Sequence, residues 1–240
     1  MKKHLIGFTM AVVIIMSGQS GAMAAGISCS EKDSACKEFS KLAAADQYDK
    51  IIEKVDAKKS YTEAARSIIG DAYLMVAGQE TNTPEQEEQF CLKALEYGAT
   101  SAYMGLYFIH AVQDPDKALG YLYQYIMTSP KDSVPYVLLG EAEMEKENYE
   151  DANLYLRMAK TVARGHSTNL DWMLFQVSYL LGDFTYASSM LDGALAQGQF
   201  VNELRSLSAN PLYADISLRP EFKKYEPLIK GASAKAMIYN

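Results

Sequence analysis

Few residues of this chain have side chains that could do chemistry, and its three cysteines are the first to consider. Cys29 and Cys36 stand seven positions apart, and in an oxidising compartment such a local pair tends to close into a disulfide. One continuous helix would separate them by about 10 Å, which is too far for the bond. Cys29 is therefore expected to fold back from an irregular segment onto the first turn of a helix that begins near Asp33 or Ser34, since both can cap a helix.

The third cysteine and the histidines give no catalytic or metal-binding pattern. Cys91 lies in the apolar stretch Phe90-Cys91-Leu92 with no histidine near it, so we predict a small buried residue. His110 is expected on a helix beside Tyr107, and His166 in a turn. A metal site needs ligands that converge, and these two fall in different predicted segments. No metal site and no cofactor are predicted, and both histidines are interpreted as ordinary polar positions.

Four carboxylates, Glu141, Glu143, Glu145 and Glu147, alternate along one predicted helix. A general acid/base pair needs burial and opposed environments that separate the two pKa values. A run of this kind, with Lys146 among its members, is more typical of a solvated face. Glu141 and Glu145 nevertheless share one side of the helix at a spacing of four residues.

Motifs of catalysis are missing from the rest of the sequence. It holds no Gly-x-Ser-x-Gly, no His-Glu-x-x-His, no phosphate-binding loop and no glycine-rich dinucleotide turn. We therefore predict no catalytic residue, and we expect that the chain is not an enzyme.

The amino-terminal residues predict export. Two lysines open the chain, an apolar run follows from Leu5 to Met16, and Ala22-Met23-Ala24 supplies the small residues of a cleavage site. An uncleaved membrane anchor is the alternative, but the run is about a dozen residues long and a spanning helix needs roughly 20. A lipid anchor on Cys29 is disfavoured by its poor flanking sequence and its distance from the apolar run. Residues 1–24 are thus predicted to be a cleaved signal peptide of a periplasmic or secreted bacterial protein.

The charge of the chain excludes some classes of partner. Losing two lysines and no acid with the leader moves the formal net charge from −7 to −9. An acidic chain without a basic stretch repels phosphate backbones and anionic membrane surfaces. Neither nucleic acid nor membrane insertion after cleavage is expected. The remaining residues, about 216 by this cleavage site, can bury the core of one domain or one continuous array.

A repeat of 34 to 35 residues runs along the chain, and apolar residues recur within it at helical spacing. The segment at 148–159 recurs at 182–194, and the segment at 116–122 precedes them by one unit. Equivalent positions hold the following pairs, each 35 residues apart: Tyr149 and Phe184, Ala152 and Ala187, Leu156 and Leu191, Ala159 and Ala194. The recurrence predicts pairs of antiparallel helices, with a non-repeating helical bundle as the alternative.

The unit from Ser133 to about His166 resembles a tetratricopeptide repeat. The residues that carry the resemblance are Tyr136, Leu139-Gly140, Ala152, Leu156 and Ala159, with Pro130 closing the preceding unit. Small residues at these places let two helices approach closely, and the large ones fill the space between neighbouring pairs. The resemblance implies an all-α, right-handed α-solenoid.

The resemblance extends upstream and weakens there. The unit from Lys93-Ala94 to Lys117-Ala118 is similar to the Sel-like subclass, and Ile69-Gly70 with Tyr73 matches part of another unit. The unit from Thr168 departs from the pattern, because Leu174-Phe175 stands where Leu-Gly is expected. We expect the following segments: signal peptide 1–24, disulfide-bearing segment 25–46, repeat array 47–209, closing element 210–230 and frayed tail 231–240.

Tetratricopeptide arrays bind partner peptides along the concave face that their first helices line, so the resemblance implies a protein-binding scaffold or adaptor. The expected face carries aromatic, apolar and acidic side chains and would suit a protein or peptide with basic and apolar residues. Its candidate binding residues are Tyr103, Tyr107, Glu141, Met144, Glu145, Trp172, Gln176 and Tyr179. The alternative for the aromatics is packing between repeats.

The Sel-like resemblance raises a second function, an enzyme or enzyme-associated factor acting on cell-wall or β-lactam substrates. Secreted members of that kind carry a regular cysteine pair in each repeat. This chain has only Cys91 within its repeats, so this implication does not carry over.

Overall fold

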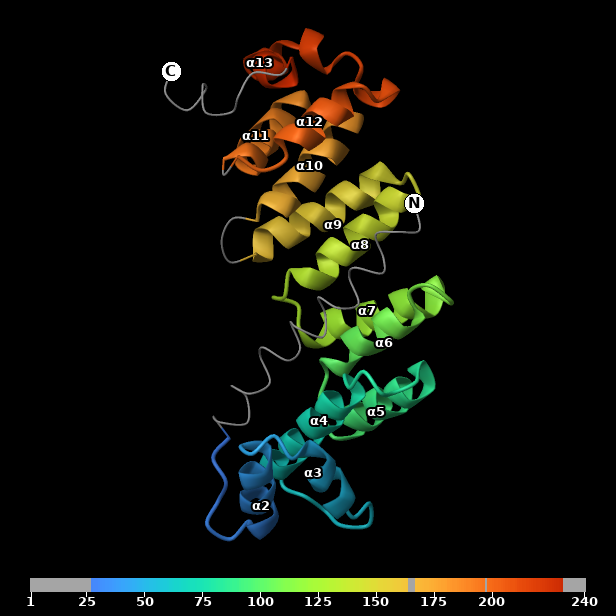
Figure 1. Cartoon of the computed structure of the whole chain (residues 1–240), viewed down its shortest axis with the longest axis vertical. Helices are drawn as coiled ribbons and strands as arrows, with labels where there is room; N and C mark the ends of the chain where they lie inside the picture. Colours follow the sequence, from blue (N-terminus) through green and yellow to red (C-terminus); the bar gives the residue numbers. More distant parts are fainter. Residues whose placement is uncertain (1–26, 164–166, 197, 231–240) are drawn as a thin grey trace. The chain divides into compact units, whose positions relative to one another are not determined.

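Over the residues that the computed structural model describes, which are 27–163, 167–196 and 198–230, the chain is entirely helical (Figure 1). The predicted signal peptide, His166 and the predicted tail 231–240 lie outside these ranges. The described residues divide into two compact units, the first ending at Thr128 and the second beginning at Ser129. Within the described ranges, no helix is both long and apolar enough to cross a membrane.

The first unit consists of helices that pack in the order in which they follow one another. α4 pairs with α5 and α6 with α7, while α2 and α3 both pack against α4. α5 also packs against α6, which joins the two pairs. The bounds are α2 Ser34–Ala43, α3 Tyr48–Lys54, α4 Glu63–Ala77, α5 Pro84–Glu96, α6 Ala102–His110 and α7 Pro115–Thr128.

The second unit repeats this arrangement and then ends in short helices. α8 pairs with α9, α10 pairs with α11, and α9 also packs against α10. The bounds are α8 Val134–Glu145, α9 Tyr149–Val162, α10 Thr168–Leu180, α11 Phe184–Leu195, α12 Val201–Ser208, η1 Pro211–Tyr213, η2 Ile216–Leu218, η3 Pro220–Tyr225 and α13 Glu226–Ile229. The prediction of an all-α protein built from sequential antiparallel helix pairs is confirmed.

The start of α5 shows how local sequence signals begin a helix. Thr83 caps α5, and its side chain and that of Gln86 each accept a hydrogen bond from the other residue's backbone N–H. Pro84 follows as the first helical residue, where its missing N–H leaves no donor unsatisfied.

Glycine lets the two helices of a pair approach closely. A Cβ placed on Gly70 of α4 would lie 2.8 Å from the Cβ of Ala99, in the turn that follows α5. A Cβ on Gly140 of α8 would lie 2.6 Å from Cγ of Leu156 on α9. Both contacts are shorter than real Cβ atoms tolerate, so only glycine fits without rearrangement.

In the last pair, α10 and α11, the helices approach closely although the repeat glycine is missing from α10. Phe175 stands at the place of the repeat glycine, is fully buried, and packs among the aromatic residues of the carboxyl-terminal helices. In this pair Gly193, on α11, provides the space, because a Cβ there would lie 3.0 Å from Cγ of Asp171 on α10. The departure from the pattern at Phe175 therefore comes with a compensating glycine on the second helix.

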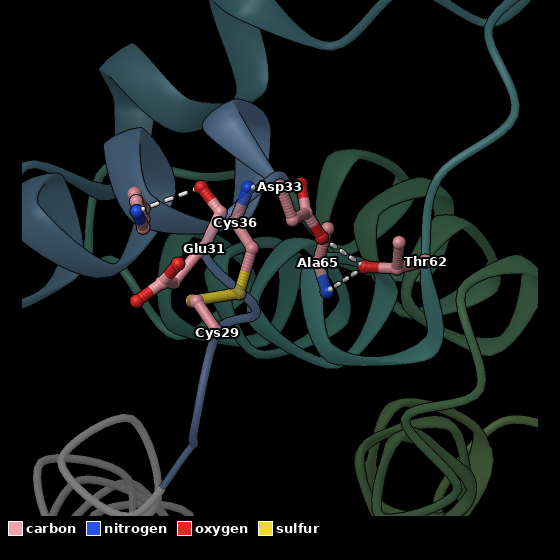
Figure 2. The surroundings of a disulfide bond; sticks show 7 residues. Cys29, Glu31, Asp33, Cys36, Thr62 and Ala65 are labelled. Carbon is pink, nitrogen blue, oxygen red and sulfur yellow. Dashed lines mark hydrogen bonds between the residues drawn. A yellow bond between two sulfur atoms is a disulfide. The ribbon is translucent and has the colours of Figure 1, made fainter.

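The predicted disulfide between Cys29 and Cys36 is present, with a Cα–Cα distance of 5.6 Å (Figure 2). Asp33 caps α2, since its carboxylate accepts a hydrogen bond of 2.9 Å from the backbone N–H of Cys36. Cys36 is fully buried in the core of the first unit, whereas Cys29 is partly buried. The irregular segment thus folds back onto the first turn of the helix, as predicted.

Asp33 also joins α2 to α4. Thr62, which caps α4, donates a hydrogen bond from Oγ1 to the second carboxylate oxygen of Asp33 and accepts one of 3.2 Å from the N–H of Ala65 (Figure 2). The hydrogen bond from the backbone of Cys36, and then that from Thr62, lowers the pKa of Asp33. The starts of two helices and the disulfide therefore form one connected corner of the first unit.

The carboxyl-terminal helices pack on α10 and α11 within the second unit. Their aromatic side chains enter one core with Phe175, Tyr179 and Leu191, and the buried members that they contribute are Leu204, Tyr213, Ile216, Phe222, Tyr225 and Leu228. The hydroxyl of Tyr225 donates to the backbone carbonyl of Ser188 at 2.8 Å. These contacts cover a face of the last pair that would otherwise be open.

Candidate functional site

The strongest candidate surface lies on α8, where three predicted residues share one face. Glu141, Met144 and Glu145 are spaced by three and four residues, which places them side by side on a helix. Glu141 and Met144 are partly buried, whereas Glu145 is exposed. The face therefore combines an apolar side chain with two neighbouring carboxylates.

The acidic run is not one solvated face: α8 ends at Glu145, before Glu147, and Glu141 and Glu143 are partly buried, so that interpretation is wrong for these two. Glu143 forms an ion pair of 2.7 Å with Lys146 and accepts a hydrogen bond of 2.9 Å from Asn148, and these contacts lower its pKa. Glu141 is in the opposite situation, because desolvation and then the charge of Glu145 raise its pKa. Among the described residues, Glu141 has no cationic partner and no hydrogen-bond donor. Neighbouring carboxylates on one helix thus have opposed environments.

α10 contributes Trp172 and Gln176 from the same unit, both partly buried. α8 and α10 are the first helices of consecutive pairs, and both pack against α9. Trp172 is already engaged on one side, since its ring is stacked on Phe200 with centroids 5.0 Å apart and an interplanar angle of 8°. It also contacts Phe175, at 5.1 Å between centroids. Its remaining exposed surface is therefore smaller than the sequence suggested.

Tyr179 does not belong to an exposed surface, which corrects the expectation for this residue. It is 4% exposed, and its ring lies 4.9 Å from that of Tyr213 and 5.4 Å from that of Phe222. Its hydroxyl donates to Asp215, and burial followed by this hydrogen bond raises the pKa of Tyr179. The carboxyl-terminal helices cover this part of α10, so Tyr179 is a core residue. The aromatic residues of segment 211–225 were the sequence signal for this covering.

Tyr103 and Tyr107 lie on α6 in the first unit and are partly buried. The ring of Tyr103 is 6.5 Å from that of Tyr121 on α7, and Tyr107 makes an edge contact of 4.9 Å with Phe108. Both aromatics are thus at least partly used in packing inside their own unit. The predicted binding residues fall into two sets, one in each unit.

A polar cluster that the sequence did not predict joins three helices of the first unit. Nε2 of His110 lies 2.9 Å from Oε1 of Glu88, and Nζ of Lys117 lies 2.9 Å from the same oxygen. The ring of Tyr121 stacks on His110 at 5.7 Å between centroids, and Lys117 lies 5.8 Å from its centre. The hydrogen bond from Lys117, and then the contact with His110, lowers the pKa of Glu88. This cluster ties α5, α6 and α7 together.

The only free thiol of the described residues is buried and unreactive. Cys91 is 3% exposed, and a Cβ on Gly105 of α6 would lie 2.8 Å from its sulfur. Burial, and then the charges of Glu87 and Glu88, raises the pKa of Cys91 to about 12. A thiol of that kind is not ionised at neutral pH and is a poor nucleophile. Cys91 is a buried apolar residue, as predicted.

Asp71 on α4 is a second residue that the sequence did not single out. Its Oδ2 atom is enclosed and has no hydrogen-bond partner, although the residue as a whole is only partly buried. Desolvation raises the pKa of this carboxyl to about 6. Asp71 directly follows Gly70, as Glu141 directly follows Gly140, so the aligned repeat positions were a signal that could have found it.

Metal binding finds no support in this geometry, because no three His, Cys, Asp or Glu side chains of the described ranges gather in one place. Compared with known proteins, the chain matches no family model, and no curated protein is similar enough to be a relative. The fold and the site therefore define a class of structure: an all-helical protein of sequential antiparallel helix pairs. The first helices of two of these pairs, α4 and α8, carry acidic side chains that are partly desolvated.

Proposed function

We propose that this protein is an exported binding module whose helix pairs form a right-handed α-solenoid of the tetratricopeptide kind. In this proposal, a segment of a partner polypeptide lies on the face formed by the first helices α8 and α10. One observation carries the proposal. Glu141 is a partly buried carboxylate without a cation among the described residues, and it stands beside Met144 on a helix of the repeat.

The chemistry of this face suits a peptide with basic and apolar side chains. Removing a carboxylate from water without a partner is unfavourable, and a Lys or Arg of a ligand would offset that loss. Met144 and the exposed part of Trp172 supply apolar contact, and methionine and tryptophan are frequent in binding surfaces. Glu145 adds a second negative charge at the solvent-exposed edge.

Export is part of the same proposal. The Cys29–Cys36 disulfide supports it, because such bonds form and persist in oxidising compartments such as the periplasm. The leader-like residues 1–24 supply the route. Amino-terminal sequencing of the protein recovered from the periplasm or medium should begin at or near Ala25, and an uncut cytoplasmic product would contradict this part of the proposal.

The state of the reactive side chains favours a binding module over a cell-wall or β-lactam-related enzyme. Cys91 is buried and protonated, and His110 is held between Glu88 and the ring of Tyr121. Both contacts hold the His110 ring against neighbouring helices of its own unit. Cys91 therefore lacks the lowered pKa and the adjacent base that activate a nucleophile.

The proposal can be tested by capture from envelope extract with the mature protein, followed by quantitative mass spectrometry. Charge reversal by Glu141→Lys or Glu145→Lys should deplete a specific set of captured proteins. Glu53→Lys is the matched control, because it makes the same charge change at an exposed residue of α3 in the other unit. Proteins lost with the two α8 variants and kept with the control are the expected partners. If all captured proteins survive both α8 variants, this face does not bind them.

A further inference from the structure

The acidic side of α8 is not neutralised by the described part of the chain. Glu141 is partly buried, and no cation of the described residues stands beside it. Glu145 lies one turn further along the same side of the helix and is exposed. Two neighbouring carboxylates of this kind attract a cation from a segment outside the described residues or from another molecule.

The sequence offers few cations outside the described ranges, namely Lys2, Lys3, Arg164 and Lys235. The two amino-terminal lysines belong to the predicted leader. Arg164 follows the end of α9, and α8 and α9 are antiparallel helices joined by the turn after Glu145. The end of α9 therefore lies beside the start of α8, away from the two carboxylates. Lys235 is the remaining candidate within the chain.

The segment around Lys235 has the chemistry that the face formed by α8 and α10 suits. Residues 231–240 contain this lysine as their single charged side chain. Large apolar residues follow it within four positions, and they are Met237, Ile238 and Tyr239. The face offers carboxylates for the lysine, and Met144 and the exposed part of Trp172 for the apolar side chains. The segment has no acidic side chain that the face would repel.

The segment also starts near this face, inside the second unit. It follows Lys230, the residue after α13. On α12, Arg205 donates a hydrogen bond of 2.8 Å from Nε to the carbonyl of Leu228 on α13. α12 begins directly after Phe200, whose ring stacks on Trp172. The helix rises by about 7.5 Å between residues 200 and 205, whereas ten extended residues span up to about 33 Å. Residues 231–240 are therefore long enough to reach Trp172.

We propose that residues 231–240 bind the face of α8 and α10 in their own molecule, with Lys235 at Glu141 and the apolar residues after it at Met144 and Trp172. This inference rests on the proposed binding function and deepens it by naming a segment that regulates the same face. A tethered segment of this length has an effective concentration of the order of 1 mM, so a weak contact is enough to occupy the face. A partner then has to displace the segment before it binds.

The first test uses the fluorescence of Trp172, the single tryptophan, in the full mature protein. Lys235→Glu should move the emission to longer wavelength and increase quenching by acrylamide, because water and quencher reach the uncovered ring. Lys223→Glu is the matched control, since it makes the same charge change at an exposed lysine of η3 in the same unit. The control should leave emission and quenching at the wild-type values. Thermal unfolding of each variant confirms that it is folded.

Exchanging the two charges identifies the contact. Glu141→Lys alone should give the same shift as Lys235→Glu, and the double variant should restore the wild-type emission. A synthetic peptide with the sequence of residues 231–240, added to the Lys235→Glu protein, should reverse the shift, whereas the same peptide with Glu in place of Lys should not. The emission of the wild type should not depend on protein concentration, because the contact is intramolecular.

Capture from envelope extract tests the regulation. A segment that covers the face at least half of the time lowers the apparent affinity for a partner at least about twofold. Lys235→Glu should therefore increase the captured amount of the proteins that depend on Glu141 by about that factor or more. Lys223→Glu should leave these amounts unchanged.

The outcomes separate this inference from the proposed function. If Lys235→Glu leaves the emission and quenching of Trp172 unchanged, the segment does not cover the face and the inference is overturned. A wild-type emission that moves to shorter wavelength as the protein concentration rises would assign the occupant to a second copy, which also overturns it. In both cases the proposed function stands as long as capture depends on Glu141. The proposed function fails only if the α8 variants lose no captured protein.

Discussion

The indole ring of Trp172 lies flat against the ring of Phe200, with centroids 5.0 Å apart and planes 8° from parallel. Phe200 makes this contact from a left-handed backbone conformation, with φ of +60°, directly before α12. A bulky residue rarely adopts that conformation, which costs about 1–2 kcal/mol. The stack with Trp172 is therefore one of the contacts that offset a strained turn.

The stack predicts that two substitutions of Phe200 will destabilise the protein to different degrees. Phe200→Ala should lower the free energy of unfolding by about 1–2 kcal/mol, because the aromatic contact is lost and the backbone strain stays. Phe200→Gly should be less harmful by about 1 kcal/mol, because glycine adopts the left-handed conformation freely. Chemical denaturation measures both.

Trp172 is the single tryptophan, so its fluorescence reports on the same turn. Its emission should shift to longer wavelength in both variants, as water reaches the uncovered face. If alanine proves as stable as glycine at position 200, the turn stores no strain of this kind.

A second prediction concerns Gly193 on α11, which faces the buried carboxylate of Asp171 and its partly exposed ion-pair partner Lys160. Gly193→Ala forces its new methyl group against Asp171 and should lower the free energy of unfolding by about 1–3 kcal/mol. Gly120→Ala on α7 is the control, since that glycine is exposed and its Cβ would meet no atom within 4 Å. The control should be neutral or stabilising by up to about 1 kcal/mol, because alanine is the better helix former. Equal effects of the two changes would argue against a close approach at Gly193.

Local patterns in the sequence were enough for much of the fold. The Cys29–Cys36 bridge depends on residues close to one helix start, and the Leu139-Gly140 pattern depends on a contact between adjacent helices. Both are short-range features, so spacing alone predicts them. The helix pairs and the buried state of Cys91 follow from the same kind of local argument.

The candidate site was harder to predict because exposure depends on distant segments. Tyr179 has the spacing of a groove residue. However, it donates a hydrogen bond to Asp215, 36 residues later, and is buried in the core that the carboxyl-terminal helices form. Glu141 belongs to a run of the kind that is usually solvated, yet packing buries part of its side chain. Asp71 belongs to no motif, and in the sequence only its position after a repeat glycine sets it apart, whereas its enclosed oxygen results from packing. A periodic pattern indicates on which face of a helix a residue lies. It does not indicate which segments further along the chain pack on that face.

The disulfide gives a third prediction, for the stability of the first unit. It closes a short loop, and in the chain-entropy description its loss should cost about 2–3 kcal/mol. The double variant Cys29→Ser, Cys36→Ser should therefore unfold at lower denaturant concentration than the wild type. Dithiothreitol should lower the stability of the wild type and leave the double variant unaffected. Cys91→Ala serves as the control and should respond to dithiothreitol as the wild type does, whereas a lost response would mean that Cys91 takes part in the bond.

The last prediction follows from the raised pKa of Asp71, which is about 6 in the folded protein against an ordinary value of 3.8. A carboxyl whose pKa is higher when folded binds its proton more tightly in the folded state, so ionisation of Asp71 opposes folding. That opposition is absent below about pH 4, grows as the pH rises through 6, and is complete above it. Asp71→Asn removes it, and the variant should be more stable than the wild type at pH 8, by about 1–3 kcal/mol. The difference in unfolding free energy between the two proteins should shrink towards pH 4. A constant difference for Asp71→Asn across this range would mean that the carboxyl is not desolvated.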